Sequence, residues 1–388
     1  MLHFRLASPS DAHSISSLWA MAFERPGDPF FDWYFGACFR PESVLLGEDG
    51  GEIATALHLH PHTLFIRGKE TAADYIVGVT THPEKRRRGL ARTLLGESFR
   101  LSRRAGHPVS ILMPSAADFY RPLGFAFYAF QWEREADSEI LLKLAEAPER
   151  TVSVSSEDGK LLAGIYEIFT AGRNGYTFRG AADWARLIES TAVCGSVILV
   201  YAKGRPAGYI FGSADENLFT ASEIAYTCEA GRRAVYAAMA GRAARCRWYE
   251  PADDKSFYNW PDGAEHTYIR NRTFPFMMAR VTDPAAAFTG LRAETDAALT
   301  FAYTDKTLPE NDGTYRLTTQ SGRILCEKYE TKETPDLTLT PPVAAQLLFG
   351  SLTPEELHHL EKLKTNQETI SKLSSIFPKR NNWINEWF

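Results

Sequence analysis

The sequence predicts a mixed α/β (α+β) protein with more than one domain, and two observations carry this prediction. The chain has 388 residues, and because one domain usually holds about 150 residues, two or three domains are expected. Short strand patterns alternate with helical patterns through most of the chain, whereas its last part carries strands first and helices afterwards. The first order is typical of mixed sheets covered by helices, and the second of a separate α+β module.

Changes in composition place the domain boundaries. The stretch 146–159 is polar, contains Pro148 and a serine cluster, and indicates a boundary. The pattern changes again near Thr282. The expected domains are therefore 1–150, 151–282 and 283–388. The first two share an order of helices, hairpin and strand–loop–helix, which indicates a diverged duplication.

Hydrophobic periodicity predicts the individual elements of each segment. The first segment is expected to contain strands at 44–46, 53–59, 75–79 and 109–113. The second is expected to contain helices at 161–170, 181–189 and 233–244 and strands at 196–202, 206–212 and 218–225. The third is expected to contain strands at 298–303, 313–319 and 323–327, then helices at 343–349, 354–362 and 368–376.

Composition and charge exclude several function classes. Apolar residues make up 44% and charged residues 23% of the chain, which is ordinary for a globular protein. The 43 basic and 48 acidic residues give a net charge of −5, so no global positive field attracts nucleic acid or anionic lipid. No apolar stretch approaches the roughly 18 residues of a membrane span, and the N-terminus does not resemble a signal peptide. The five cysteines are scattered without a CxxC pair, so we expect a cytoplasmic protein without a disulfide framework or zinc site.

The most informative stretch joins the strand at 75–79 to a helix that begins near Gly89. Pro83 ends the strand, and Leu90, Ala91 and the apolar residues after them fall on one helix face. A helix N-terminus exposes unpaired N–H groups, a glycine lets the backbone approach a ligand, and arginine matches phosphate geometry. A solvated basic loop is the simpler interpretation of the charge alone. The order of strand, proline, arginines, glycine and helix instead favours a pyrophosphate site.

This stretch resembles the acetyl-CoA signature of the GNAT N-acetyltransferases, R/Q-x-x-G-x-G/A. The matching residues here are Arg86, Gly89 and Ala91, with alanine where many members of the family have glycine. The resemblance implies that the strand before the loop splays from its neighbour and pairs with the pantetheine arm of the cofactor. It implies acetyl-CoA as co-substrate and no metal. The cofactor-binding residues that it implies are Val79, Thr81, Arg86, Arg87, Gly89, Leu90, Ala91 and Ser115.

A second stretch, PSAADFYRPLGF (114–125), is similar to the Eis (enhanced intracellular survival) acetyltransferases. In those enzymes a serine lies five residues before the tyrosine that protonates the leaving thiolate, and Ser115 and Tyr120 have that spacing. The join at 274–284 and the C-terminal tail NNWINEWF also resemble this family. The resemblance implies two tandem GNAT domains with splayed sheets, the second degenerate and without CoA, and a sterol-carrier-like C-terminal domain. It further implies a homo-oligomer, since Eis-like proteins include hexamers.

The resemblance assigns a role to the end of the chain. Eis-like enzymes place their C-terminal carboxylate in the active site of the first domain, and Phe388 is the matching residue. Because only the neutral form of an amine attacks a thioester, a carboxylate that accepts the ammonium proton through water serves the reaction. Tyr120 has the opposite task, since its reference pKa of about 10 lies only slightly above the roughly 8.5 of a thiol. Without the resemblance, simpler interpretations hold. Tyr120 would be a tyrosine packed in the core, Ser115 would cap the following helix, and the chain terminus would be frayed.

Other polar groups are weaker signals. His58, His60 and His62 alternate along a strand, but no cysteine or carboxylate completes a metal site nearby, so none is predicted. Four residues lie in the N-terminal region that walls the acceptor pocket in Eis-like enzymes. Their carboxylates and aromatic rings suit a polyamine, and they are Glu24, Asp28, Phe30 and Trp33.

These observations predict an acetyl-CoA-dependent N-acetyltransferase for small polycationic amines, aminoglycosides being the best-known acceptors of the family. Two alternatives stay open from the sequence. One is an apolar-ligand binding protein of the sterol-carrier type in which the GNAT domains act as scaffold. The other is N-acetylation of proteins or peptides.

Overall fold

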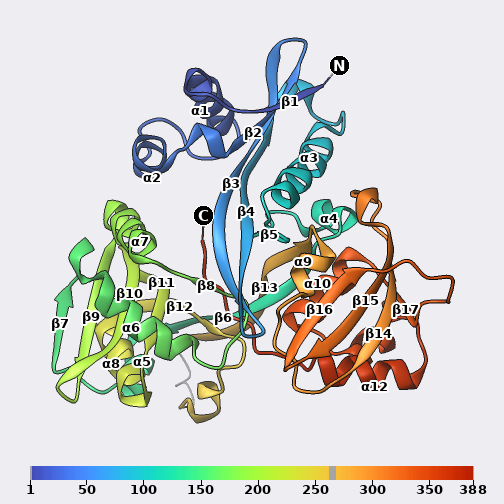
Figure 1. Ribbon diagram of the computed structural model, residues 1–388. Coiled ribbons are helices and arrows are strands. Elements are labelled where there is room, and N and C mark those ends of the chain that lie inside the picture. The colour runs from blue at the N-terminus through green and yellow to red at the C-terminus, as the bar shows by residue number, and fades with distance from the viewer. Residues whose placement is uncertain (1, 262–267, 388) are drawn as a thin grey trace.

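The computed structural model describes residues 2–261 and 268–387. One mixed sheet runs through the first two segments, and a four-stranded sheet with its own helices forms the C-terminal part. In Figure 1 the long hairpin of strands β3 and β4 stands in the centre. The helices and strands of the second segment lie on one side of it and the C-terminal part lies on the other. The prediction of a mixed α/β fold with an α+β C-terminal module is confirmed.

The first part of the chain contains six strands and the helices that cover them. The strands are β1 (His3–Leu6), β2 (Val44–Asp49), β3 (Glu52–Ile66), β4 (Lys69–Thr81), β5 (Val109–Leu112) and β6 (Ala126–Asp137). The helices are α1 (Ala12–Ala20), α2 (Pro29–Trp33), α3 (Leu90–Arg104), α4 (Ala117–Tyr120) and α5 (Ser138–Leu144). The apolar stripe of α3 packs on the sheet, with Leu94, Leu95 and Phe99 fully buried.

The middle part adds seven strands and three helices. The strands are β7 (Arg150–Ser153), β8 (Tyr176–Phe178), β9 (Ser196–Ala202), β10 (Arg205–Asp215), β11 (Leu218–Tyr226), β12 (Arg245–Pro251) and β13 (Ile269–Val281). The helices are α6 (Gly159–Thr170), α7 (Ala181–Cys194) and α8 (Glu229–Ala240). The helix expected at 233–244 thus begins and ends four residues earlier. The polar stretch 146–159, expected as a boundary, contains the exposed edge strand β7.

The first and second segments share one sheet. Strand β13, from the end of the second segment, lies among the strands of the first. The strand order is β1-β2-β3-β4-β5-β13-β6-β12-β11-β10-β9-β7, with β8 paired to β3. Strand β13 lies antiparallel between β5 and β6, with Met278 opposite both Leu112 and Phe127. Its side chains at Phe276, Met277 and Met278 are fully buried. Strands from the two ends of these segments are therefore neighbours in the sheet, as Val281 and Val109 show.

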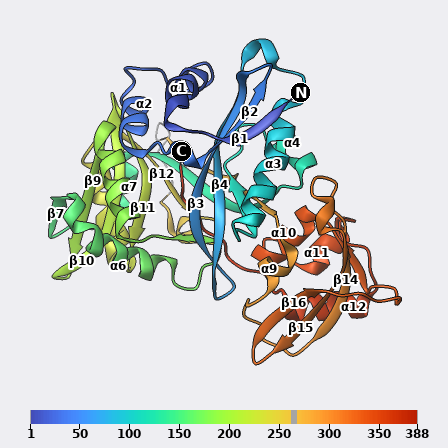
Figure 2. The same ribbon diagram turned by 45° about the horizontal axis from the view of Figure 1, so that its top comes forward.

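The C-terminal part forms its own layer of strands and helices. Its strands are β14 (Ala298–Tyr303), β15 (Gly313–Gln320), β16 (Arg323–Lys328) and β17 (Leu337–Leu339). Its helices are α9 (Pro284–Phe288), α10 (Pro341–Phe349), α11 (Pro354–His359) and α12 (Gln367–Ile376). Figure 2 shows this layer beside the first part and away from the second. No helix within 2–261 and 268–387 is long and apolar enough to cross a membrane.

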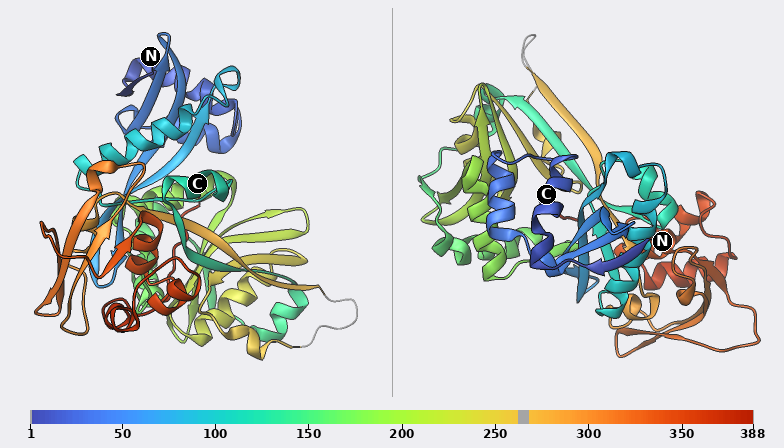
Figure 3. Two further views of the ribbon diagram at one scale, coloured as in Figure 1. Left: turned by 90° about the vertical axis from the view of Figure 1, so that its right-hand side faces the viewer. Right: turned by 90° about the horizontal axis from the view of Figure 1, so that it is seen from above.

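The last described residues leave the C-terminal part and return to the middle of the molecule. After α12, an extended tail passes Asn174, with which Asn382 forms a parallel bridge. Trp383 and Ile384 are fully buried, and Trp383 packs its ring edge-on against Phe169 of α6. Figures 1 and 3 show the end of the tail between α2, the β3–β4 hairpin and α7.

Candidate active site

The loop after β4 presents an open helix N-terminus. Gly89 is the N-cap of α3, with a φ of 77° that favours glycine, and no side chain caps the helix. A Cβ built at Gly89 meets no atom within 4 Å. The first turn of α3, with the N–H groups of Leu90 and Ala91, therefore begins at an exposed glycine without a side-chain cap, which suits a bound anion.

The three arginines of this loop differ in their contacts. Arg86 donates from Nε to the carbonyl oxygen of Thr81, 3.1 Å away, and Arg88 pairs with Asp49 at 2.7 Å. Arg87 has a φ of 63° and forms no ion pair with any residue that the structure describes. All three side chains are exposed. The loop thus leaves guanidinium groups beside the helix N-terminus.

Strand β4 has a free edge next to this loop. It pairs in parallel with β5 only from Ala73 to Tyr75, and within the described chain no strand pairs with that edge beyond Tyr75. The other edge has a bulge opposite β3, where Gly78 takes a φ of 60°. A Cβ at Gly78 would collide with the ring of Trp19. The two strands therefore splay, as the sequence resemblance implied.

The splay opens into a cleft of about 320 Å³. Residues of β4, of the segment that follows β5 and of β13 line it, among them Val79, Met113, Ser115, Tyr120 and Phe276. Thr81 lies further along β4, where its hydroxyl is 3.1 Å from that of Thr55. The structure therefore places the predicted positions 79 to 91, Ser115 and Tyr120 along one path from the helix N-terminus into the cleft.

Tyr120 ends the short helix α4, and its side chain is buried at the wall of the cleft. Burial raises the pKa of Tyr120, so the phenol keeps its proton at neutral pH. Its hydroxyl forms no hydrogen bond with a described residue. Ser115 is exposed in the same cleft, and the N-cap of α4 is Ala116 rather than Ser115. Both groups are thus open to a ligand.

A second cavity of about 100 Å³ adjoins the cleft, since Phe30 and Tyr75 line both. Its other walls include Trp33, His60, His62, Arg186, Glu386 and Trp387. Three of the four N-terminal residues singled out in the sequence therefore lie at a cavity wall, because Glu24 lines the cleft. Asp28 does not line either cavity. It is the N-cap of α2, and its carboxylate accepts a hydrogen bond from the main-chain N–H of Arg25.

The tail is fixed at this cavity by buried hydrogen bonds from three elements. Tyr75 on β4 donates to the carbonyl oxygen of Glu386 at 3.0 Å, and Gln131 on β6 donates to that of Ile384 at 2.8 Å. Asn385 donates to Glu223 and to the carbonyl oxygen of Ser222, on the part of β11 that lies beyond its pairing with β12. The tail therefore occupies the splay of the second segment.

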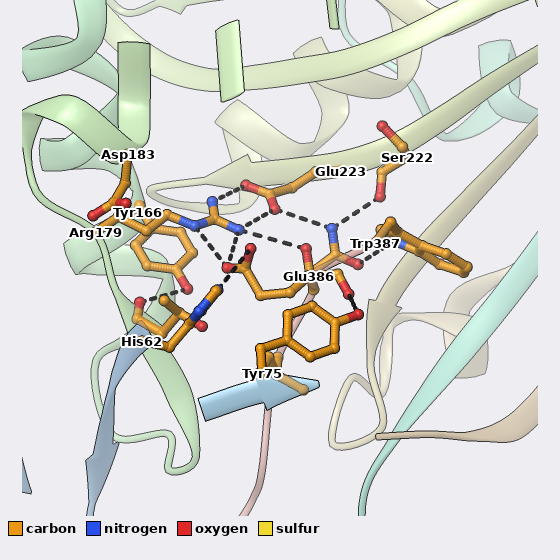
Figure 4. A network of polar contacts seen from close by, with 12 residues as sticks. His62, Tyr75, Tyr166, Arg179, Asp183, Ser222, Glu223, Glu386 and Trp387 are labelled. Carbon is orange, nitrogen blue, oxygen red and sulfur yellow. Dashed lines mark hydrogen bonds and ion pairs between the residues drawn. The ribbon is translucent and has the colours of Figure 1, made fainter. Parts of the chain in front are cut away.

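Arg179, just after β8, joins the tail to the second segment (Figure 4). Its guanidinium donates to both carboxylate oxygens of Glu223 at 2.7 and 2.8 Å and to Oε1 of Glu386 at 3.0 Å. Burial on its own would raise the pKa of Glu386, but the Arg179 charge lowers it below its ordinary value. Glu386 is therefore an ionised carboxylate at the cavity wall.

Tyr34 connects two of the strand histidines. Its hydroxyl lies 2.7 Å from Nδ1 of His58 and 3.2 Å from Nε2 of His60. Burial lowers the pKa of each histidine to about 3, so both are neutral. Among residues 2–261 and 268–387, no group of three or more His, Cys, Asp or Glu side chains could hold a metal ion.

The corresponding loop of the second segment differs from the first. Cys228 is the N-cap of α8, and Glu229 in the first turn pairs with Arg232 at 2.6 Å. A Cβ at Gly231 would collide with the carbonyl oxygen of Ala207. The helix start is therefore covered and carries a carboxylate, which opposes an anionic ligand.

Several site residues could not be found from sequence motifs. Arg179, Glu223 and Glu386 come from three distant segments; only Glu386 belongs to a stretch that the sequence singled out, the tail NNWINEWF, and nothing there distinguished this carboxylate. No sequence pattern marks Tyr34 as a site residue, because its contact with His58 exists only in the folded chain. The predicted terminal residue Phe388 lies outside the described residues. Trp387 is the last residue described, and its ring packs against Phe276.

Comparisons with known proteins agree with this geometry. Residues 3–128 match the acetyltransferase (GNAT) domain, and residues 284–385 match the sterol carrier protein domain. None of the curated proteins compared with the chain matches it.

Solved structures similar to this one cover the whole chain. A GCN5-related N-acetyltransferase from Anabaena variabilis has 18% identity and a TM-score of 0.85, with 100% of both chains covered. A probable N-acyltransferase from Enterococcus faecalis has 17% identity and a TM-score of 0.86, again over 100% of both chains. Eis1 from Mycobacterium abscessus has 16% identity and a TM-score of 0.74 over 100% of both chains. Residues 3–128 therefore form a GNAT acetyltransferase domain and residues 284–385 a sterol carrier protein domain, and the whole chain shares its overall fold with an Eis protein.

Proposed function

We propose that the protein is an acetyl-CoA-dependent N-acetyltransferase that acts on primary amines of small polycationic, aminoglycoside-like acceptors. The observation that carries the proposal is the position of Tyr120. This buried side chain lies at the wall of a cleft between the N-terminus of α3 and a cavity lined by a carboxylate and aromatic rings. A cofactor site and an acceptor site thus meet at one proton donor.

The residues of the first site fit acetyl-CoA. The N–H groups of Leu90 and Ala91, with Arg86 and Arg87, suit the diphosphate, because the Gly89 backbone is open on that side. The free edge of β4 at Val79 and Thr81 suits the amides of the pantetheine arm. Ser115 adds a hydroxyl in the cleft. When bound, acetyl-CoA supplies an acetyl group activated as a thioester.

Tyr120 serves as the general acid in this proposal. Tyr120 would donate its phenol proton to the sulfur as the carbon–sulfur bond breaks and the nitrogen–carbon bond forms, and it would regain a proton from the newly acylated nitrogen through water. Reference pKa values put this transfer uphill by roughly 2 kcal/mol, and burial, which raises the pKa of Tyr120, adds to that cost. Positioning of the hydroxyl in the cleft offsets it. The terminal carboxylate of Phe388 takes the acceptor's ammonium proton through water.

The walls of the cleft and of the adjoining acceptor cavity suit a cationic amine. Glu24 and Glu386 contribute carboxylates, and Phe30 and Trp33 contribute rings that favour cation–π contact. The fold shared with Eis1 from Mycobacterium abscessus supports the same class of reaction.

Calorimetric titration with acetyl-CoA tests the first step. The wild-type protein is expected to bind, and Arg86→Ala to bind at least tenfold more weakly. Arg104→Ala, which removes an exposed arginine at the far end of α3, serves as the matched control. Turnover with a panel of amines that includes aminoglycosides then tests the acceptor class. One residue added after Phe388 should lower turnover without weakening acetyl-CoA binding.

A second candidate function rests on the sterol carrier protein domain. A groove of about 640 Å³ lies between β6 and α10, with Phe127, Phe130, Val343 and Leu352 among its lining residues. An apolar ligand there would make the protein a lipid carrier. A lipid extract of the purified protein decides this: stoichiometric lipid together with no acetyl-CoA binding would favour the carrier.

A further inference from the structure

The strands of the two tandem segments separate at corresponding places. In the first segment, β4 pairs in parallel with β5 from Ala73 to Tyr75, and the cleft opens beyond that pairing. In the second, β11 pairs in parallel with β12 only from Leu218 to Ala221, although β11 continues to Tyr226. One helix, α3 or α8, lies between the two strands in the sequence in each case. The second segment therefore has a counterpart of the splay that opens into the cleft.

The tail of the chain lies in this counterpart. The side-chain amide of Asn385 donates to the carbonyl oxygen of Ser222 at 2.9 Å and to Glu223 at 3.0 Å, both on β11 just beyond the pairing. The ring of Trp387 packs against Tyr249, the first residue of β12 after the pairing, with 4.7 Å between centroids. The tail thus contacts both strands where they separate.

Arg179 supplies the positive charge in this contact (Figure 4). Its side chain is 1% exposed, and two of its nitrogens donate to the two carboxylate oxygens of Glu223. Two nitrogens also donate to Oε1 of Glu386, at 3.1 and 3.0 Å, while Nε2 of His62 lies 4.0 Å from Oε2. A guanidinium group has a planar fork of donors, so it fixes both the distance and the direction of the carboxylates that it joins.

Glu386 is held from both segments at once. Its side chain bonds to Arg179 of the second segment, and its main-chain carbonyl oxygen accepts the hydroxyl of Tyr75 on β4. Glu386 is two residues from the end of the chain, so its position limits where the terminal carboxylate, the proposed proton acceptor, can lie. A change at Arg179 therefore reaches the acceptor cavity through the tail.

The second segment offers little to a cofactor at this place. The start of α8 is covered at Gly231 and carries Glu229 in its first turn, and both features oppose an anionic ligand. Arg179 is not among the residues that line the cleft or the acceptor cavity. Any effect of Arg179 on acetyl transfer must therefore pass through the residues that it holds.

We propose that the second segment is a binding site for the tail, and that Arg179 is the positioning residue through which this segment acts on acetyl transfer. The inference rests on the proposed acetylation and on the proposed role of the terminal carboxylate. It gives the segment without a cofactor site a part in the reaction.

Turnover by full-length variants tests the role of Arg179. Loss of Arg179 alone would leave two carboxylates buried together, so the reference is Glu223→Gln, in which Arg179 still pairs with Glu386. The double variant Arg179→Gln/Glu223→Gln differs from this reference only at Arg179. We expect its kcat to be at least tenfold lower than that of the reference. The dissociation constant of acetyl-CoA should agree within twofold, because the proposed cofactor site lies in the first segment.

A change at the end of the chain separates positioning from support of the fold. The same two variants are made with one residue added after Phe388, which displaces the carboxylate that Arg179 is proposed to position. In that background the two variants should differ less than twofold in kcat. An equal loss with the native and the extended tail would show that Arg179 only supports the fold, and would overturn the inference.

Asn385→Ala tests the binding site without removing a buried charge, so it remains decisive if the double variant does not fold. Hydrogen exchange of the 382–387 segment should become at least fivefold faster, and kcat should fall at least threefold. Asn381→Ala, at an exposed position of the tail before this site, is the control and should change neither. Unchanged exchange in Asn385→Ala would refute the binding site, and unchanged kcat would refute its action on the transfer.

The result is distinguishable from failure of the proposed function. A wild-type protein that acetylates amines, with equal losses in both tail backgrounds, refutes the inference and leaves acetylation standing. A wild-type protein that acetylates no amine refutes the proposed function and the part of Arg179 in it. Hydrogen exchange in Asn385→Ala then still decides whether the second segment binds the tail.

Discussion

The hydroxyl of Tyr75 donates a hydrogen bond to the main-chain carbonyl oxygen of Glu386, 3.0 Å away. Tyr75 is the last residue of β4 that pairs with β5, and Glu386 lies in the tail of the chain. The bond therefore joins two places. One is the point where β4 separates from β5, and the other is the C-terminal tail, which lines the acceptor cavity.

Removal of this bond should loosen the tail. Tyr75→Phe leaves a buried carbonyl oxygen without its donor, so we expect a loss of stability of about 1 to 3 kcal/mol. Hydrogen exchange of the 382–387 segment should become at least fivefold faster. Tyr315→Phe is the control, because its hydroxyl also donates to a buried carbonyl oxygen, that of Asn311. That variant should lose similar stability without faster exchange in the tail, and unchanged exchange in Tyr75→Phe would contradict the assigned role.

Gly89 offers a test of the cofactor site with a closely matched control. Gly89 and Gly106 have φ values of 77° and 78°, and a Cβ at either meets no atom within 4 Å. Gly89→Ala and Gly106→Ala should therefore each cost about 1 to 2 kcal/mol of backbone strain. Only Gly89→Ala should weaken acetyl-CoA binding, by tenfold or more, as measured by calorimetry. An equal effect of both variants would mean that strain rather than ligand contact is responsible.

Tyr120→Phe should lower kcat by about a hundredfold or more, because a general acid contributes that much. The dissociation constant of acetyl-CoA should stay within twofold of the wild-type value. Tyr303→Phe, which also removes a buried hydroxyl without a hydrogen-bond partner in the described chain, is the control. Wild-type turnover in Tyr120→Phe would refute its role as proton donor.

The buried histidines predict acid sensitivity. Burial lowers the pKa of His58 and of His60 to about 3, while an unfolded histidine titrates near 6.5. The unfolded state therefore binds more protons between pH 6.5 and pH 3, and stability falls as pH decreases through that window. Each histidine contributes up to about 1.4 kcal/mol per pH unit.

Denaturant unfolding at pH 7 and pH 5 measures this effect. His58→Gln removes one titrating ring and should reduce the loss between the two pH values by up to about 2 kcal/mol. His13→Gln, which removes an exposed imidazole on α1, is the control. A loss of wild-type size in His58→Gln would show that other groups cause the acid sensitivity.

Local patterns predicted much of the first site. The strand at 75–79, the arginine-rich loop, Gly89 and the helix after it lie within one continuous stretch, so periodicity and turn chemistry are sufficient to identify them. The hairpin was predicted too short, since the strand expected at 53–59 extends to Ile66 in β3. Apolar and polar residues do not alternate regularly in the second half of β3. The tail and the second segment cover His62 and its neighbours on the face that would otherwise be exposed to solvent and polar.

The acceptor side could not be predicted in the same way. The contacts of Arg179 with Glu223 and Glu386 join residues more than 40 and more than 200 positions apart. No periodicity connects such positions, and each residue type is usually exposed. Only the return of the tail makes them neighbours. Likewise, no strand was predicted at Ile269–Val281, and the sequence could not show that β13 leaves its own segment for the sheet of the first.

The insertion of β13 between β5 and β6 has a consequence for biosynthesis. While the ribosome is making the first half of the chain, the gap between these two strands has no occupant, and their facing backbone groups have no ladder to join. The sheet that supports Tyr120 is complete only after Val281 has left the exit tunnel. The nascent chain therefore completes the sheet around Tyr120 late, only after both of the first two segments have emerged.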